Sequence, residues 1–314
     1  MVEKLPSYSY YPSDAAEIIN ASKDLPHRKK IVEQLTAAVI QNGLQPSSLE
    51  EEQNMREQVN AWDSSIVGLG KAFEHAELTE DQKVLLEVIL NGRRRIDAVI
   101  CGMNAAGQPS AVVTEGKGWH NRRKGKNKKK FAYRYDQIPS HDTSKLLLVF
   151  SENALVDGEL PSWRVVEKPH RQVWNYTAEV RTKVRELSED DLLAITPALY
   201  FTETDRIPKR WDTVMKADLQ SDMRRIPVFT KGSKKNETMY KDISEYLQMH
   251  VGHGAGNEAL RILDDALSLS AVAPQSDPIM RELFYGAELS EIDEQRYRNY
   301  CDLLNLRTRY ILKD

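Results

Sequence analysis

Two carboxylates and a lysine are the residues of this chain best placed to do chemistry, because they interrupt apolar segments. Asp97 lies within Arg95–Ile100, and Glu115 and Lys117 end the run Ala111–Lys117. An unpaired carboxylate is costly to bury among apolar residues, so each acid is expected to have a partner or a metal ion. Taken separately, each charge also fits a solvated position on a strand edge. Their order along the chain favours one common site.

The spacing of these residues suits a site for a hard divalent cation. Side chains alternate along a strand, so Glu115 and Lys117 share one face and Gly116 lies between them. The carboxylates of Asp97 and Glu115 and the backbone carbonyl of Gly116 are oxygen ligands of the kind that Mg²⁺ or Mn²⁺ binds. Such an ion would polarise a phosphodiester, while Lys117 would orient water or neutralise charge in the transition state. The pattern predicts a centre that cleaves phosphodiester bonds.

Two further signals extend the expected site. Gln172 and Tyr176 are four residues apart in a segment of helical character. Residues at this spacing share a helix face, so both side chains are expected to reach the same pocket. Glu87 lies in the strand expected beside that of Asp97 and is a further candidate acid.

A dense basic tract follows the Glu-x-Lys strand. Seven of the nine residues from Arg122 to Lys130 are basic, although the formal net charge of the chain is −3. A loop of this charge would bind nucleic-acid phosphates by releasing counterions. A solvated surface loop and a targeting sequence are the alternatives, and the closeness of the tract to the acids favours nucleic-acid binding. Its basic residues are Arg122, Arg123, Lys124, Lys126, Lys128, Lys129 and Lys130.

The motifs together resemble the PD-(D/E)XK nuclease superfamily. The resemblance rests on Arg-Ile-Asp-x-Val, on Val-x-Glu-x-Lys-x-Trp (Val113 to Trp119) and on Gln-x-x-x-Tyr, which is similar to the RecB-like branch. More closely, the chain resembles the nuclease-like N-terminal region of bacterial proteins that continue into a Schlafen group 3-like helicase. The resemblance implies two metal ligands, a catalytic lysine and two motif residues near the scissile phosphate. These are Asp97 and Glu115, Lys117, and Gln172 and Tyr176, respectively.

Two features depart from this pattern. The middle residue of Glu-x-Lys is usually apolar in the family, whereas here it is Gly116, and a glycine within a strand often marks a close approach of another group to the backbone. The chain also contains no Gly-x-x-x-x-Gly-Lys-Ser/Thr loop, so no ATP site is expected within it. The resemblance therefore implies a helicase as a separate subunit or a fused domain, with a role in DNA processing or antiviral defence.

Hydrophobic periodicity predicts an α/β fold with a mixed central sheet flanked by helices, and the resemblance implies that this fold is PD-(D/E)XK nuclease-like. We expect an N-terminal helical segment (1–48), a nuclease-like core (49–235) and a helical C-terminal extension (236–314) leading toward the helicase. Strands are expected at 85–90, 97–103, 111–115, 145–150, 163–166, 195–202 and 226–229. Helices are expected at 13–19, 27–41, 49–73, 170–187, 240–250, 257–269, 278–283 and 291–304.

The composition indicates a reducing compartment. Cys101 and Cys301 are too few for a disulfide framework. The sequence shows neither a secretory signal nor an apolar run approaching 18 residues. We therefore expect a cytoplasmic protein with no membrane association.

These observations predict a Mg²⁺-dependent deoxyribonuclease, with endonuclease and exonuclease action both open. One alternative keeps the fold without the chemistry, as a nucleic-acid-binding or scaffold module that delivers DNA to a partner helicase. The presence of Asp97, Glu115 and Lys117 together argues against it. A small-molecule phosphohydrolase is a third interpretation, which fits the acids and leaves the basic tract unexplained.

Overall fold

The fold is described from a computed structural model of the 314-residue chain. The structure describes residues 76–90, 95–117, 163–187, 193–201, 209–230 and 238–269, with 9–10, 132–133, 145–149 and the single positions 12, 69, 73 and 207. The helices expected at 13–19, 27–41, 278–283 and 291–304 lie outside these residues, as does most of the helix expected at 49–73.

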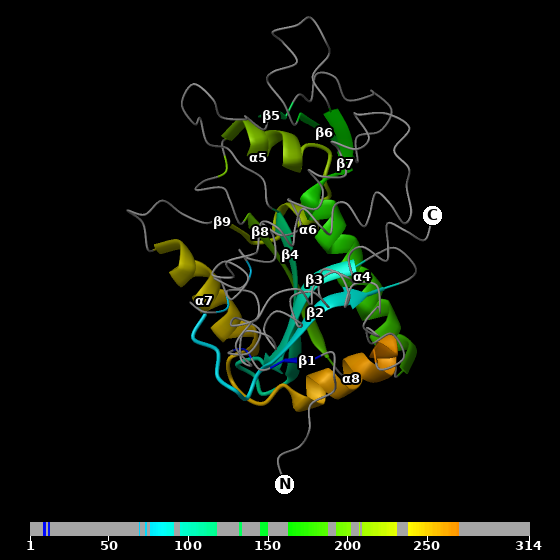
Figure 1. The fold of residues 1–314 in the computed structure, drawn as a ribbon, viewed down its shortest axis with the longest axis vertical. Coiled ribbons are helices and arrows are strands. Elements are labelled where there is room, and N and C mark those ends of the chain that lie inside the picture. The colour runs from blue at the N-terminus through cyan, green and yellow to red at the C-terminus, as the bar shows by residue number, and fades with distance from the viewer. Residues whose placement is uncertain are drawn as a thin grey trace, which may run out of the picture.

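A six-stranded mixed sheet forms the centre of the described structure (Figure 1), and its strand order is β1-β2-β3-β4-β8-β9. The strands are β1 (Ser9–Tyr10), β2 (Lys83–Ile89), β3 (Arg95–Met103), β4 (Pro109–Lys117), β8 (Ala194–Phe201) and β9 (Val228–Thr230). The first four pair antiparallel, whereas β8 is parallel to β4 and β9 is parallel to β8. The expected α/β class and mixed sheet are confirmed.

Helices cover both faces of the sheet. α4 (Pro169–Leu187) packs on one face together with α8 (Asn257–Leu267), and α7 (Thr238–Val251) lies on the opposite side against β3 and β4 (Figure 1). Although α7 and α8 fall in the segment expected as a C-terminal extension, α8 contributes buried side chains to the same core as α4 and the sheet. None of the described helices has the length and apolar character needed to cross a membrane.

β4 is the best-buried strand of the site because it lies between β3 and β8. Every residue from Ser110 to Gly116 is buried, so both faces of the strand are covered. Strands buried on both faces read as continuous apolar runs, which explains the sequence Ala-Val-Val in β4. Glu115 and Lys117 therefore end a central strand, where the alternative of a solvated sheet edge does not apply.

The turn between β3 and β4 sets the register of the two strands. Asn104 Oδ1 accepts hydrogen bonds from the N–H groups of Ala106 and Gln108 at 3.0 and 3.1 Å. Gly107 has φ +74°, a conformation that glycine adopts without steric cost. This hairpin aligns Ala98 with Thr114, next to the two acids.

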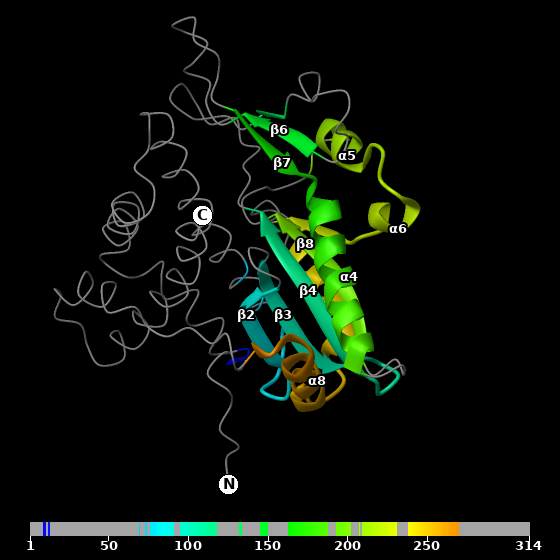
Figure 2. The ribbon, with the colours of Figure 1, turned by 90° about the vertical axis from the view of Figure 1, so that its right-hand side faces the viewer.

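A second, three-stranded sheet is inserted between β4 and α4. It consists of β5 (Ala132–Tyr133), β6 (Lys145–Val149) and β7 (Trp163–Glu167) in antiparallel order. It lies beyond the C-terminal end of β4, near α5 (Lys209–Lys216), and α6 (Ser221–Arg224) follows α5 in the chain (Figure 2). The inserted segment follows the C-terminal end of β4. It ends at β7, which only Lys168 separates from the start of α4.

Pro197 lies within β8 although proline has no N–H to donate to a strand ladder. On the side of β8 away from β4, β9 pairs only with Leu199 to Phe201, so Pro197 precedes the β9 ladder. The Pro197 carbonyl instead accepts a hydrogen bond from the Tyr246 hydroxyl of α7 at 2.9 Å. A residue without an N–H is tolerated here because this part of β8 is an edge within the described structure.

Candidate functional site

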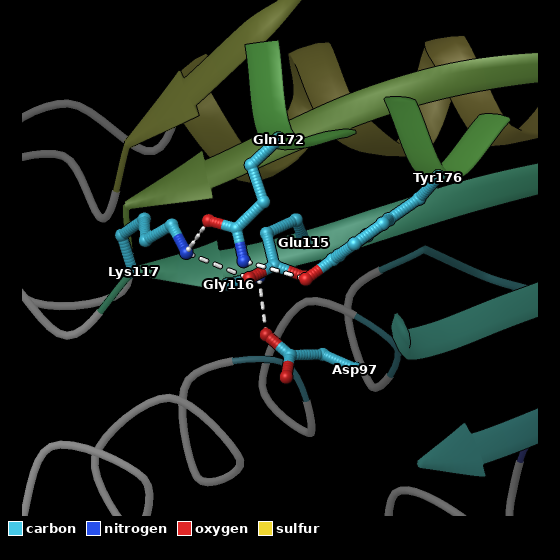
Figure 3. Close-up of polar contacts among 6 residues, drawn as sticks. All are labelled: Asp97, Glu115, Gly116, Lys117, Gln172 and Tyr176. Carbon is cyan, nitrogen blue, oxygen red and sulfur yellow. Dashed lines mark hydrogen bonds and ion pairs between the residues drawn. The ribbon is translucent and has the colours of Figure 1, made fainter. Parts of the chain in front are cut away.

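Asp97 and Glu115 are buried at the ends of neighbouring strands (Figure 3). Their relative exposures are 7% and 4%, which excludes the interpretation of both as solvated charges. The β3–β4 register runs from Met103 opposite Pro109 to Ala98 opposite Thr114, so the two acids come directly after its last pair. The strand ends thus bring together two acids that are 18 residues apart in the sequence.

The backbone of the Glu-x-Lys segment holds Asp97. The Gly116 N–H donates a hydrogen bond to Asp97 Oδ2 at 2.7 Å (Figure 3). A hydrogen bond to an ionised acceptor is stronger than one between neutral groups, so this contact helps to explain a buried carboxylate in an apolar strand. A residue in a strand directs its N–H and C=O to the same side. The Gly116 carbonyl is therefore expected on the side where Asp97 lies.

Lys117 joins the acid of β4 to the first turn of α4. Its Nζ donates hydrogen bonds to Glu115 Oε1 at 2.6 Å and to Gln172 Oε1 at 2.7 Å (Figure 3). The Lys117 and Glu115 side chains form an ion pair that is only 13% and 6% exposed. An ammonium group has donors and no acceptor, which fixes the amide of Gln172 with its oxygen toward the amine. The positive charge is thus held beside the Glu115 carboxylate.

The helix α4 brings Gln172 and Tyr176 to the same place. Pro169 is the first helical residue, a position where the absent N–H costs nothing and its fixed φ suits the helix. Val173 and Tyr176 are buried on the face that packs on the sheet. Gln172 Nε2 donates a hydrogen bond to the Tyr176 hydroxyl oxygen at 2.8 Å. The expected sharing of one helix face is confirmed, and a hydrogen-bond chain runs from Lys117 through Gln172 to Tyr176.

The remaining candidate residues are placed only in part. The antiparallel register of β2 and β3 puts the backbone of Glu87 opposite Asp97, while the Glu87 side chain lies outside the described part of the structure. The basic residues expected to bind nucleic acid also lie outside it. These are Arg122, Arg123, Lys124, Lys126, Lys128, Lys129 and Lys130.

The oxygen atoms of the site fit a divalent cation that keeps some of its water. Two carboxylates and a backbone carbonyl are hard donors, and Mg²⁺ is commonly bound through one or two carboxylates with water as the other ligands. Within the described residues, no group of three or more His, Cys, Asp and Glu side chains could hold a metal ion. The donor set from the described residues is therefore Asp97, Glu115 and the Gly116 carbonyl. Glu115 shares one of its oxygens, Oε1, with Lys117.

Two buried basic residues at the start of α4 were not expected as parts of the site. Lys168 is 3% exposed, its Nζ donates to the Ala217 carbonyl, and burial lowers its pKa. His170 is fully buried, and burial lowers the pKa of its imidazole to about 4, with the positive charge of Lys216 adding to the effect. His170 is therefore neutral at neutral pH. Burial of these side chains depends on how the segment around α5 docks on α4, so no local pattern in the sequence signals it.

Comparison with known proteins returns no match for this chain among family models, curated proteins or solved structures. The interpretation of the site therefore rests on its own residues, their burial and their contacts. The resemblance to PD-(D/E)XK nucleases remains a prediction from the sequence motifs.

Proposed function

We propose that the chain is a metal-dependent nuclease that hydrolyses DNA phosphodiester bonds with Mg²⁺ or Mn²⁺. The observation that carries this proposal is the convergence of three separate elements, β3, β4 and α4, on one buried polar cluster. The cluster contains two carboxylates, a lysine and a Gln–Tyr pair, which are the groups that the sequence motifs predicted to act together. They are Asp97, Glu115, Lys117, Gln172 and Tyr176.

The two acids, the lysine and the glutamine have different parts in the proposed reaction. Asp97 and Glu115 would hold the ion with the Gly116 carbonyl, and the ion supplies Lewis-acid polarisation of the phosphodiester when bound. Lys117 stabilises the negative charge that develops on the phosphoryl oxygens, because its ammonium is fixed before the substrate arrives. Gln172 keeps that ammonium in place through the 2.7 Å hydrogen bond. A preorganised positive charge thus comes from the chain itself.

DNA is the proposed substrate because the basic tract begins close to the site in the chain. Arg122 follows Lys117 by five positions, a span of at most about 18 Å for a fully extended chain. A duplex advances about 34 Å in one turn, so the start of the tract stays within about half a turn of DNA from Lys117. Lysines and arginines at this distance would bind phosphates that flank the scissile bond. The resemblance adds a helicase, as a partner or a fused domain, in DNA processing or antiviral defence.

A specific observation also favours a second function, that of a nucleic-acid-binding module that delivers DNA to a helicase. Lys117 occupies Glu115 Oε1, and an ammonium at a carboxylate competes with a metal ion for it. Under this function, DNA binding would need the basic tract and would be independent of Asp97.

The test incubates the purified chain with linear and circular DNA, single- and double-stranded, in Mg²⁺, Mn²⁺ or EDTA. Asp97→Asn and Lys117→Met remove a charge with little change in volume. Asp265→Asn, at an exposed ion pair with Arg261 on α8, is the matched control. Cleavage that needs metal, persists in the control and falls at least about a hundredfold in both site variants, about 2.7 kcal/mol, supports the nuclease.

The same experiment separates the alternatives. Cleavage that is equally fast in Asp97→Asn overturns the assignment of the site. DNA binding without cleavage that survives Asp97→Asn but fails after neutralisation of Lys128, Lys129 and Lys130 supports the delivery module. If a nuclease is found, cleavage of the circular substrates distinguishes endonuclease from exonuclease action.

A further inference from the structure

Gly116 lies between Glu115 and Lys117 and contacts Asp97, so one residue without a side chain touches the whole acidic part of the site. We propose that Gly116 is a positioning residue that sets the Asp97 carboxylate for metal binding, through its N–H and through the space left by its missing side chain. The inference rests on the proposed function, since it takes Asp97 as a metal ligand. It deepens that function by naming what fixes the ligand.

The N–H of Gly116 determines where one carboxylate oxygen lies. Asp97 Oδ2 accepts this hydrogen bond at 2.7 Å, beyond the last β3–β4 pair, so a side-chain oxygen takes the place that a strand carbonyl would have in a continued ladder. Gly116 is covalently next to Glu115. Asp97 Oδ2 is therefore anchored to the backbone beside Glu115, whose own carboxylate is held by Lys117.

The missing side chain is as important as the N–H. A Cβ atom at position 116 would lie 3.3 Å from Asp97 Oδ2 and 3.4 Å from Cδ1 and Cγ of Leu69. Leu69 is 1% exposed, so it is packed in the core and has little room to move. Asp97 Oδ2 is the closer of the two neighbours, and it lies at the end of a side chain. An added methyl group would therefore displace the Asp97 carboxylate by a few tenths of an ångström.

A displacement of this size matters for a small, hard cation. Mg²⁺ requires nearly ideal octahedral geometry with oxygen ligands at about 2.0–2.1 Å. Loss of a group that orients a metal ligand typically lowers metal affinity by about 10- to 100-fold. We therefore expect Gly116→Ala to lower the affinity about tenfold and Gly116→Val to lower it further. A glycine that serves only packing against Leu69 would alter stability and leave metal affinity unchanged.

The experiment measures Mn²⁺ binding to the full chain by electron paramagnetic resonance, with Mg²⁺ affinity obtained by competition. The variants are Gly116→Ala, Gly116→Val and Asp97→Asn. Thr114→Val is the matched control, because it changes a buried side chain of the same strand that is not part of the polar cluster. Thermal unfolding in EDTA checks that each variant is folded. Alanine is accepted in strands at least as readily as glycine, so Gly116→Ala is expected to fold.

The outcomes separate this inference from the proposed function. Mn²⁺ binding that is lost in Asp97→Asn, about tenfold weaker in Gly116→Ala with a changed spectrum of the bound ion, and unchanged in Thr114→Val supports the inference. Gly116→Ala that binds as tightly as the natural chain overturns the inference and leaves the proposed metal site standing. Equal Mn²⁺ binding by the natural chain and Asp97→Asn overturns the metal site, and the inference with it.

A second measurement needs no variant at Gly116. In nuclear magnetic resonance spectra of the ¹⁵N-labelled chain, the Gly116 amide resonance should shift in Asp97→Asn and also when Mg²⁺ is added, because both change the acceptor of its hydrogen bond. A Gly116 resonance that moves in neither case overturns the inference.

Discussion

The buried ion pair of Lys117 and Glu115 gives a prediction that can be tested without any substrate. Lys117→Met keeps the side-chain stem and removes the ammonium. The Glu115 carboxylate, whose side chain is 6% exposed, then loses its 2.6 Å ion pair. Removing one partner of a buried pair typically costs about 3–5 kcal/mol because a charge stays behind in a poorly solvated place. Lys117 is itself 13% exposed, so we expect the low end, about 3 kcal/mol.

The assay is urea denaturation at pH 7 in EDTA, with the free energy of unfolding obtained by linear extrapolation. Glu115→Gln in the Lys117→Met background removes the remaining charge, so most of the lost stability should return. Adding Mg²⁺ should also stabilise Lys117→Met more than the natural chain, because the ammonium no longer competes for the carboxylate and binding to the folded state adds to its stability.

Two results would refute this reasoning. One is a free energy of unfolding for Lys117→Met within about 0.5 kcal/mol of the natural chain, the range typical of surface substitutions. The other is a double variant that is no more stable than Lys117→Met alone. Either result would show that the buried Glu115 carboxylate does not depend on Lys117 for its stability.

Three other predictions follow from the same structure. Gln172→Leu removes the hydrogen bonds to Lys117 and Tyr176. It should lower the rate of DNA cleavage about 10- to 100-fold, because a hydrogen bond to a charged group contributes about 1.5–3 kcal/mol. The circular dichroism spectrum should be unchanged, and Gln220→Leu, at an exposed position, is the control. The pKa of His170 in the folded chain, about 4, is below the ordinary 6.5, so the unfolded chain binds the proton at a higher pH than the folded chain does. The free energy of unfolding should therefore fall by up to about 3 kcal/mol as the pH drops from about 6.5 to about 4. Urea titrations at pH 7 and pH 5 should show this dependence, and His170→Leu should flatten it. Neutralising Lys128, Lys129 and Lys130 should weaken DNA binding. The slope of log K against log salt concentration should become less negative by up to about 2.7, or about 0.9 for each phosphate that is no longer neutralised. Fluorescence anisotropy at several salt concentrations would measure this slope.

The strands were predictable from the sequence where burial dictates the pattern. The run Ala111–Val113 is apolar because β4 is covered on both faces, and the turn at Asn104 carries its own side-chain hydrogen bonds. β9 was expected from Ile226 but begins at Val228. Ile226 is buried, as its hydrophobicity indicates, yet its N–H bonds to the Met223 carbonyl in the turn after α6. Hydrophobicity reports burial, and it does not distinguish a buried turn from a buried strand.

The contacts of the site depended on tertiary structure and could be predicted only in part. Glycine at position 116 signalled a close approach to the backbone, and the spacing of Gln172 and Tyr176 signalled a shared helix face. Neither pattern identifies the residue that makes the contact. The approach of Asp97 to Gly116 depends on where the β3–β4 ladder ends, and the contact of Lys117 with Gln172 depends on how α4 docks on β4. The two-residue strand β1 is too short to show any periodicity.

The arrangement around Pro197 also has a consequence for how the protein behaves at high concentration. An exposed strand edge with free N–H and C=O groups can pair with a strand of another molecule and start aggregation. In the part of β8 that β9 does not cover, Pro197 offers no N–H and its carbonyl is already bound by Tyr246. This part of β8 therefore offers a strand of another molecule no N–H donor at Pro197, which works against pairing between copies of the chain along it.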